Sequence, residues 1–507
     1  MSTDKQININ IIKNINRIKS TLGNSTDLII RQLDINHFKL AVFSIKDLAN
    51  NDKLDNLSLE LNKLVTSQIC EKNTLEAFYN KLKALVLCET KLVEGSDYET
   101  LYDELLSGNT IILIDGYYKF LSLYTYGPES RSITEPTSQT IIRGSKEAFT
   151  EKLTLNIALI RKRVKDKSLK VEELRLGSIT KTKVAIIYLN NIAKPDIVNE
   201  IRSRLNQIEI DGILESGYIE ELIKDDPYSV FPTFLNSERP DAVTAGLLEG
   251  KVAILVDGSP YILTAPALFA DFLQVSEDYY HHFFVSSMTR IIREIAFFLT
   301  LMVPSLYIAL TTFHQEMIPT TLLISIAAQR EGVPFPAFVE AIFMELTFEI
   351  LREAGIRMPR VIGPAISIVG ALVLGQEAVE AGFISAAIVI VVSITAIASF
   401  AIPNYAMSNA VRVLRFFLMI LSATFGLFGI YMAIIALTLH LCKLKSVGVP
   451  YLTPLAPRLA KENKDTIVRF PLWKMKYRPS ATAKTNDPRI KKAEPVKSDK
   501  KQEQEFK

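Results

Sequence analysis

The chain has 507 residues, of which 48% are hydrophobic, and its formal net charge is +3. Its mean hydropathy of +0.19 is high for a wholly soluble protein, so membrane segments are expected. Two observations disfavour a nucleic-acid-binding protein: the net charge is near neutral, and the basic cluster at 161–167 lacks interleaved aromatic residues.

The first 23 residues form a polar leader in which charged and amide side chains interrupt every apolar run. A signal peptide needs a continuous apolar core, so we expect the first half of the chain to stay in the cytoplasm. Cys70, Cys88 and Cys442 are widely spaced and match no metal or redox motif. This pattern is typical of a reducing compartment without a disulfide framework.

Residues 24–273 are expected to form an α/β region, because apolar runs of strand length alternate with charged segments of helical period. The expected strands include 38–45, 110–114, 119–124, 183–189 and 252–256. The expected helices include 74–87, 146–164 and 196–207.

This α/β region contains an internal repeat. Residues 105–116 read LLSGNTIILIDG and residues 247–258 read LLEGKVAILVDG, with seven identities in twelve positions. In each copy a helix ends at a glycine, a strand follows, and Asp-Gly turns the chain into a second strand. We predict two related subdomains, 24–145 and 146–273; the alternative is a likeness produced by shared turn chemistry.

A membrane domain is predicted over 295–445, after an interfacial approach over 274–294 that is rich in aromatic residues and carries Arg290 and Arg293. The positive-inside rule applied to these arginines places the N-terminal domain in the cytoplasm. Four to six spans are expected among the apolar segments 295–313, 317–328, 335–351, 361–375, 383–402 and 416–442.

Two of these segments have a second interpretation as a re-entrant or interfacial pair. Residues 317–328 are too short to cross, and 335–351 carries Glu340, Glu345 and Glu349. Lys443 and Lys445 follow the last segment and favour a cytoplasmic C-terminus, which requires an even number of crossings.

The C-terminal segment, 446–507, is basic and expected to be mostly disordered. From residue 458 onward it holds 15 Lys or Arg against 7 Asp or Glu, a charge of +8, which leaves −5 for the rest of the chain. Such a tail either rests on anionic lipid headgroups or is simply solvated.

Several long motifs resemble one known family. They are FHQEMIPTTLLISIAAQREGVPFP from Phe313, MELTFEILREAGIRMP from Met344, RGSKEAFTE from Arg143, ERPD from Glu238 and GVPYLTPLAP from Gly448. Over roughly 22–457, the chain closely resembles the GerA family of spore germination proteins.

The resemblance implies an A subunit of a nutrient germinant receptor in the inner membrane of a bacterial endospore. In that family the A subunit works with a transporter-like B subunit, thought to bind the nutrient, and a lipoprotein C subunit. The A subunits are believed to form a ring-shaped homo-oligomer that conducts ions. Accessory channel proteins of the spore membrane share the same architecture, so the resemblance leaves that alternative open.

Small residues form a stripe on the predicted helix 361–375: Gly363, Ser367, Gly370, Ala371 and Gly375. This stripe is interpreted either as a helix-packing seam or as a pore-facing surface in a ring of identical subunits. Glu377 and Glu380 follow it, and in a symmetric oligomer each carboxylate would form a ring that selects cations.

Glu345, Glu349 and Arg352 share one face of the helix at 335–351, while Glu340 lies on another. They mark either an intramembrane functional site or the polar face of an interfacial helix.

Glu238, Arg239, Pro240 and Asp241 form a helix-start signal, which the resemblance makes a candidate structural or inter-subunit motif. Phosphate loops, metal-ligand clusters and nucleophile–base pairs were not found in the sequence, so we expect neither a cofactor nor enzymatic activity. Besides the gated channel, the competing functions are a non-conducting signal transducer or scaffold and, less favoured, a secondary transporter.

Overall fold

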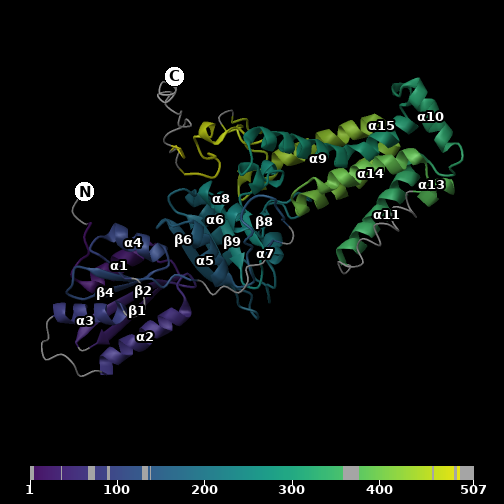
Figure 1. The fold of residues 1–507 in the computed structure, drawn as a ribbon. Helices are drawn as coiled ribbons and strands as arrows, with labels where there is room; N and C mark the ends of the chain where they lie inside the picture. Colours follow the sequence, from purple (N-terminus) through teal and green to yellow (C-terminus); the bar gives the residue numbers. More distant parts are fainter. Residues whose placement is uncertain are drawn as a thin grey trace, which may run out of the picture. The chain divides into compact units, whose positions relative to one another are not determined.

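The computed structural model describes residues 5–35, 37–66, 75–87, 92–127, 135–136, 139–357, 376–459, 462–484 and 488–490. They fall into two compact units (Figure 1). The α/β unit takes its described residues from Met1–Pro227, Phe234–Pro266 and Lys476–Lys491. The helical unit takes them from Tyr228–Thr233 and Ala267–Met475.

The α/β unit contains two five-stranded sheets with related connections. The elements of the first subdomain are α1 (Ile11–Thr21), β1 (Leu28–Ile35), β2 (Phe38–Ile45), α2 (Asn51–Thr66), α3 (Leu75–Leu87), β3 (Leu92–Gly95), α4 (Tyr98–Leu106), β4 (Thr110–Ile114) and β5 (Phe120–Leu123). The elements of the second are α5 (Leu153–Arg163), β6 (Leu169–Leu176), β7 (Thr182–Leu189), α6 (Pro195–Asn206), α7 (Ser216–Ile223), β8 (Leu235–Ser237), α8 (Pro240–Leu248), β9 (Val252–Val256) and β10 (Ile262–Ala265).

The two sheets have the same topology. Their strand orders are β1-β2-β4-β5-β3 and β6-β7-β9-β10-β8, and every neighbouring pair is antiparallel. Gly116 and Gly258 turn β4 and β9 toward the next strand with φ of 84° and 91°, a conformation that favours glycine. The predicted pair of related α/β subdomains is confirmed.

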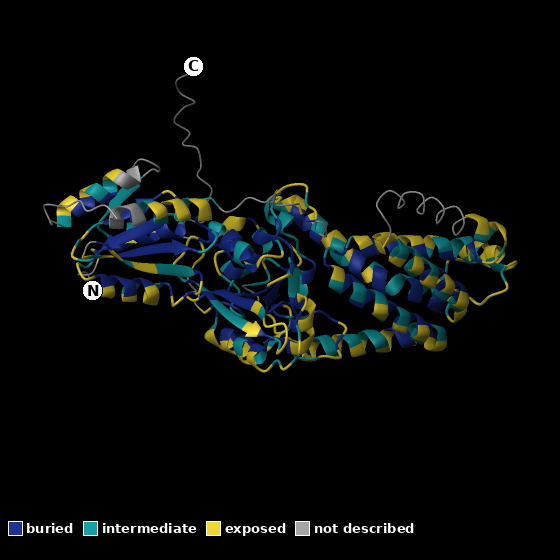
Figure 2. Ribbon diagram, turned by 90° about the horizontal axis from the view of Figure 1, so that it is seen from below, coloured by how far each residue is buried: buried dark blue, intermediate teal, exposed yellow. Residues whose placement is uncertain are grey.

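Helices cover both faces of the first sheet, as alternation along β2 requires. Ala41, Phe43 and Ile45 pack in a core with α1 and α4, whereas Leu40 and Val42 pack in a second core with α2 and α3. In the second subdomain, α5 and α8 pack against β7 and β9 in the equivalent way. The strands β4, β5, β9 and β10 are buried at every residue, and Figure 2 shows buried strands in dark blue within both sheets.

The structure differs from two predicted boundaries. The first subdomain begins before residue 24, because α1 buries Ile11, Ile15 and Ile18 in its core. The helix predicted over 146–164 begins only at Leu153, because the preceding stretch is extended and the Phe149 N–H bonds to the Glu238 carbonyl at 2.8 Å.

The helical unit begins at Ala267, apart from one short earlier stretch. Its elements are η1 (Phe269–Phe272), η2 (Ser276–Tyr279), α9 (Phe283–Thr312), η3 (Gln315–Met317), α10 (Thr320–Arg330), α11 (Ala337–Arg357), α13 (Ala378–Glu380), α14 (Ala386–Phe400), α15 (Tyr405–Lys443), β11 (Lys445–Ser446), β12 (Val449–Pro450) and η5 (Leu472–Lys474).

Within the described residues, two helices are long and apolar enough to cross a membrane, α9 and α15, and α14 is a shorter apolar helix. α15 has 39 residues, or about 58 Å of helix, nearly twice the thickness of a hydrocarbon core. Gly426 interrupts it with φ 58° and ψ −140°. The predicted segment 361–375 lies outside the described residues.

Part of the C-terminal segment belongs to the α/β unit. The Thr482 hydroxyl donates to the Glu249 carbonyl at 2.5 Å, and the Arg478 side chain donates to the Leu248 carbonyl at 3.0 Å. Ala483 is buried in the core of the second subdomain. Residues 491–507 of the predicted tail lie outside the described residues.

Candidate functional site

A cluster of opposite charges, buried at its centre and half-buried at its edge, joins α11 to α15; we call Glu345, Glu349, Arg412 and Arg415 the ion cluster. The Arg415 Nη2 lies 2.7 Å from Glu345 and 3.2 Å from Glu349. The side chains of Glu345 and Arg415 are 0% and 1% exposed. Glu345 and Glu349 therefore share one partner, one helical turn apart on the same face of α11.

Arg412 completes the ion cluster from the next turn of α15. It binds both oxygens of Glu349, with its Nε 2.9 Å from Oε1. This two-point geometry suits arginine, whose planar fork matches a carboxylate. Arg352, predicted to share the face of Glu345 and Glu349, lies near enough to Glu349 to interact with it electrostatically, and its guanidinium lies over the ring of Phe400, 5.4 Å from the ring centroid.

The deepest part of the ion cluster is incompletely satisfied. The Arg415 Nε and Nη1 have no hydrogen-bond partner among the described residues, and Glu345 contacts Arg415 at ion-pair distance without hydrogen-bond geometry. Burying an ion pair costs desolvation that only complete hydrogen bonding offsets, so such a pair is poor evidence for a purely stabilising role.

Glu340 makes a separate site, as expected from its position on α11. Its side chain is fully buried and accepts hydrogen bonds from the Ser385 backbone at 3.0 Å and hydroxyl at 2.8 Å. Ser385 precedes the first turn of α14, where a carboxylate is favoured by the helix dipole. Arg330 at the end of α10 contacts the same carboxylate at 3.3 Å. Glu340 thus links α10, α11 and α14.

The predicted small-residue stripe lies outside the described residues: Gly363, Ser367, Gly370, Ala371 and Gly375. Glu377 and Glu380 are described, and both are exposed in and beside the short helix α13. Gln376 donates to Glu380 at 3.2 Å. In the single chain these two carboxylates therefore face away from the packed core.

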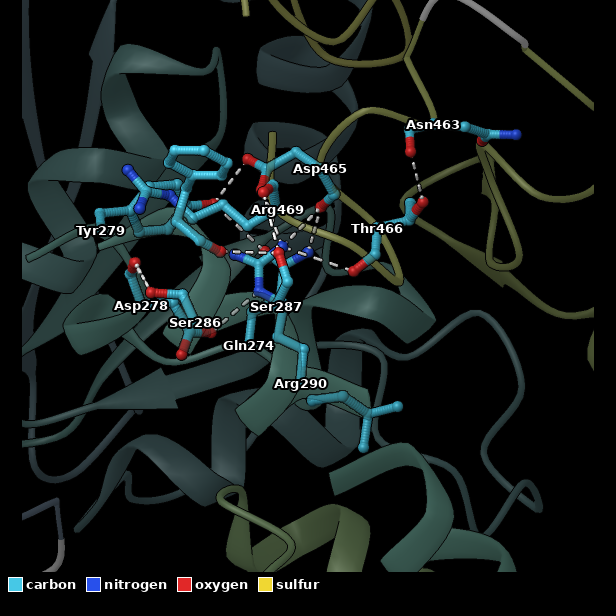
Figure 3. A network of polar contacts seen from close by, with 12 residues as sticks. Gln274, Asp278, Tyr279, Ser286, Ser287, Arg290, Asn463, Asp465, Thr466 and Arg469 are labelled. Carbon is cyan, nitrogen blue, oxygen red and sulfur yellow. Dashed lines mark hydrogen bonds and ion pairs between the residues drawn. The ribbon is translucent and has the colours of Figure 1, made fainter. Parts of the chain in front are cut away.

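A second polar network surrounds the start of α9 (Figure 3). Arg290 is buried and contacts Asp278 at 3.0 Å and Asp465 at 2.8 Å, while Arg293 contacts Asp278 at 2.9 Å. The sequence placed both arginines in an interfacial approach to the membrane. Asp278 from the preceding turn pairs with both of them, and Asp465 from a distant segment pairs with Arg290, so their charge alone is a weak indicator of orientation.

The motif at 238–241 makes a group of buried polar contacts inside the α/β unit. Arg239 is buried, contacts Asp241 at 2.6 Å and donates to the Ser145 carbonyl at 3.1 Å. Pro240 and Asp241 occupy the first turn of α8, as the helix-start signal predicted. Glu238 is also buried, and its carbonyl accepts from Phe149.

The motif at 143–151 contributes the Ser145 carbonyl to these contacts. Glu147 contacts Lys162 at 2.6 Å and Arg163 at 2.5 Å, both at the end of α5. Burial alone would raise the pKa of Glu147, but these two hydrogen bonds hold it below its usual value. The motifs at 143–151 and 238–241, which are distant in sequence, are therefore in direct contact in the second subdomain.

Sequence reasoning missed the basic half of the ion cluster. Arg412 and Arg415 come directly before the apolar run predicted to start at 416, and that position was their only signal. Helix periodicity places them on one face, but a partner on another helix is not visible in a single sequence. Asp465 was missed for the same reason, within a tail that looked only basic.

The comparisons with known proteins point to one family. The family model described as Bacillus/Clostridium GerA spore germination protein matches residues 16–481. Spore germination protein KA of Bacillus subtilis (strain 168) is 47% identical over 481 residues, covering 94% of this chain and 88% of that protein. The uncharacterized membrane protein YfkQ of the same strain is 41% identical over 499 residues, covering 98% of this chain and 96% of that protein.

A solved structure is also similar to the N-terminal part of the chain. It is the crystal structure of the N-terminal domain of the A subunit of the Bacillus megaterium spore germinant receptor GerK3. It is 33% identical, covers 53% of this chain and 98% of that domain, and has a TM-score of 0.41. The family match over residues 16–481 and the similarity to spore germination protein KA show that the chain belongs to the GerA family of spore germination proteins.

Proposed function

We propose that this chain is the A subunit of a nutrient germinant receptor and that several copies form a gated ion channel in the spore inner membrane. The ion cluster is the observation that carries this proposal. Ionisable groups inside a membrane-embedded helical bundle are costly and mark ion pathways or switches. Here two carboxylates and two guanidinium groups lie between α11 and α15.

The outer surface of the helical unit supports its placement in a membrane. On α14, Ile397 and Phe400 are 71% and 66% exposed, and on α15, Phe425 and Phe428 are 60% and 64% exposed. Large apolar side chains on the outside combined with charges on the inside invert the pattern of a soluble helical domain. Lipid is the surrounding that suits this inversion.

The contacts of the C-terminal segment support the placement of both ends of the chain on the same side of the membrane. The Lys194 N–H donates to the Thr482 carbonyl at 3.2 Å, and Thr482 also bonds to Glu249, so this segment folds with the α/β unit. The helices of the helical unit come between the two parts in sequence, which favours an even number of crossings. We assign this shared side to the cytoplasm, because Lys443 and Lys445 are exposed at the end of α15 and the positive-inside rule places such cations on the cytoplasmic side.

The remaining parts of the proposal concern the assembly. The small residues Gly363, Ser367, Gly370, Ala371 and Gly375 would line or pack around a central axis, and Glu377 and Glu380 would form rings of negative charge. The exposure of both glutamates in the single chain is compatible with such rings. A transporter-like B subunit and a lipoprotein C subunit are the proposed partners.

Ion flux through liposomes that contain the purified protein, with and without its partners, tests the proposal. We expect nutrient-dependent flux from the complete receptor and a lower cation-to-anion permeability ratio for the Glu377→Gln, Glu380→Gln double variant. Unchanged selectivity in an assembled, conducting receptor would remove these two residues from the pore. Absence of flux from an assembled receptor that still triggers germination would favour a non-conducting transducer.

A further inference from the structure

The loop formed by residues 463–475, here called the C-terminal loop, turns Asp465, Thr466 and Arg469 inward and most of its apolar side chains outward. Asp465 and Arg469 face α9, where Asp465 contacts Arg290 at 2.8 Å and the Arg469 carbonyl accepts from Ser287 at 3.0 Å (Figure 3). Thr466 is buried beside them. The loop is therefore fixed to α9 by polar contacts rather than by an apolar core.

The outward side of the C-terminal loop is apolar and aromatic. Its exposed side chains are Ile467 (44%), Val468 (38%), Phe470 (38%), Leu472 (49%) and Trp473 (38%). In water a loop of this size would expose its polar groups and bury these side chains, because hydration of apolar surface is unfavourable. The reversed arrangement indicates a surrounding other than bulk water.

The apolar side of this loop continues onto the first turns of α9. Trp473 packs edge-on against Phe283, with ring centroids 6.0 Å apart, and the neighbouring Phe284 and Met288 are 68% and 66% exposed. Because α9 is one of the two helices able to cross a membrane, its first turns lie where a bilayer surface would be met. Aromatic rings are enriched at that depth.

Two further features favour lipid as the occupant. Lys464 and Lys474 are exposed at the two ends of the apolar stretch, where they can reach anionic headgroups. A cavity of about 140 Å³ lies between the loop and α9, and its mainly apolar wall includes Ile467, Phe297 and Phe298. The wall also includes Gln274, Arg290, Glu294 and Thr466, so its apolar part is the surface that hydrocarbon can contact.

We infer that the C-terminal loop is a membrane-interface anchor, in which Ile467, Phe470, Leu472 and Trp473 enter the headgroup boundary of an anionic bilayer. The buried contacts of Arg290 with Asp278 and Asp465 hold it against the start of α9. The inference rests on the proposed membrane location of the helical unit. Beyond that location, it assigns a lipid-binding surface to the C-terminal loop, which does not cross the membrane.

Trp473 makes a direct test possible, because it is the only tryptophan of the chain. The full-length protein is reconstituted in vesicles whose phospholipids carry bromine either near the glycerol or near the chain end. We expect strong quenching of Trp473 by the shallow bromines, weaker quenching by the deep ones, and little quenching by acrylamide added in water. Omitting anionic lipid should lower the shallow quenching, and the Lys464→Gln, Lys474→Gln variant should lose this dependence.

The Val468→Glu, Leu472→Glu double variant should lose most of the shallow quenching, because both side chains are exposed and neither lines the cavity, so the bilayer is what penalises the charge. Ile179→Glu is the matched control, since Ile179 is 77% exposed in the α/β unit, and it should leave the quenching unchanged. Quenching by acrylamide without quenching by bromine would overturn the inference. Protection from both quenchers would also overturn it and indicate a protein partner.

Flotation of the vesicles after an alkaline wash separates this inference from the proposed function. Protein that floats but shows no bromine quenching contradicts the anchor and leaves the membrane location intact. Protein that fails to float contradicts both.

Discussion

Asp257 does in the second α/β subdomain what Asp115 does in the first. Asp115 accepts a hydrogen bond from the Ile11 N–H at 2.9 Å, and Asp257 accepts one from the Leu153 N–H at 3.1 Å, each donor 104 residues earlier in the chain. Each donor is the first residue of a helix, where backbone N–H groups lack partners within the helix. The repeat therefore includes a specific polar contact and is more than shared turn chemistry.

Equivalent substitutions in the two copies should have equivalent costs. Asp115→Ala and Asp257→Ala each remove a charged acceptor from a helix start, so each should lower the free energy of unfolding by roughly 1–2 kcal/mol. Urea unfolding of the α/β unit, expressed as residues 5–266 joined through a flexible linker to residues 476–490, measures the change. Asp55→Ala, at an exposed position on α2, serves as control and should change stability by less than about 0.5 kcal/mol. A large cost for only one of the two aspartates would contradict the equivalence.

Local patterns were sufficient to predict the strands and the repeat, because alternating apolar residues and Asp-Gly turns act over a few residues. The prediction for β2, 38–45, matches the structure at both ends. The role of α1 was missed because its isoleucines alternate with polar residues and read as a leader. Arg415 as the partner of Glu345, and Asp465 as a partner of Arg290, were missed because each lies on a segment distant in sequence, and only the fold brings them together.

The pair Asp27–Arg161 should be sensitive to the loss of one charge. Its Nε–Oδ2 distance is 2.8 Å, and the two side chains are 2% and 1% exposed. Arg161→Met leaves Asp27 as a buried carboxylate without its cation, which should cost roughly 3–5 kcal/mol of unfolding free energy. The Asp27→Leu, Arg161→Met double variant should recover most of that loss. Equal instability of the single and double variants, measured by urea unfolding, would argue against this account.

Glu172 should make the α/β unit less stable in acid. Burial alone would raise the pKa of Glu172, but hydrogen bonds from Arg202 and Tyr188 lower it below its usual value. Burial and the same hydrogen bond raise the pKa of Tyr188 to about 12. A lowered pKa in the folded state gives stability that is present above the unfolded pKa of about 4.3 and is lost as pH falls through the folded value.

The measurement is the unfolding free energy of the same linked α/β unit between neutral pH and pH 3, for the unmodified protein and for Glu172→Gln. The difference between the two should be largest at neutral pH and should shrink below about pH 4.3. Glu209→Gln, at an exposed position, is the control and should follow the unmodified protein at every pH. A constant difference across this range would mean that the charge of Glu172 contributes nothing.

The ion cluster allows stability and function to be separated. Arg415→Met removes the cation shared by Glu345 and Glu349, so it should lower the stability of the helical unit by roughly 3–5 kcal/mol. A quadruple variant, Glu345→Gln, Glu349→Gln, Arg412→Met and Arg415→Met, removes all four charges together. It should fold about as well as the unmodified protein, because the four charges of the ion cluster are removed together and none of them is left without its partner.

The two possible roles of the cluster then give opposite results. If the charges only hold α11 against α15, the quadruple variant restores thermal stability in detergent and also restores ion flux and the germinant response. If the charges take part in gating, it restores stability alone, and this is the outcome we expect because the Arg415–Glu345 contact is incompletely hydrogen-bonded. Glu353→Gln with Arg357→Met, an exposed pair on the same helix, is the matched control and should affect neither measurement. Full germinant response from the quadruple variant would contradict a gating role for the ion cluster.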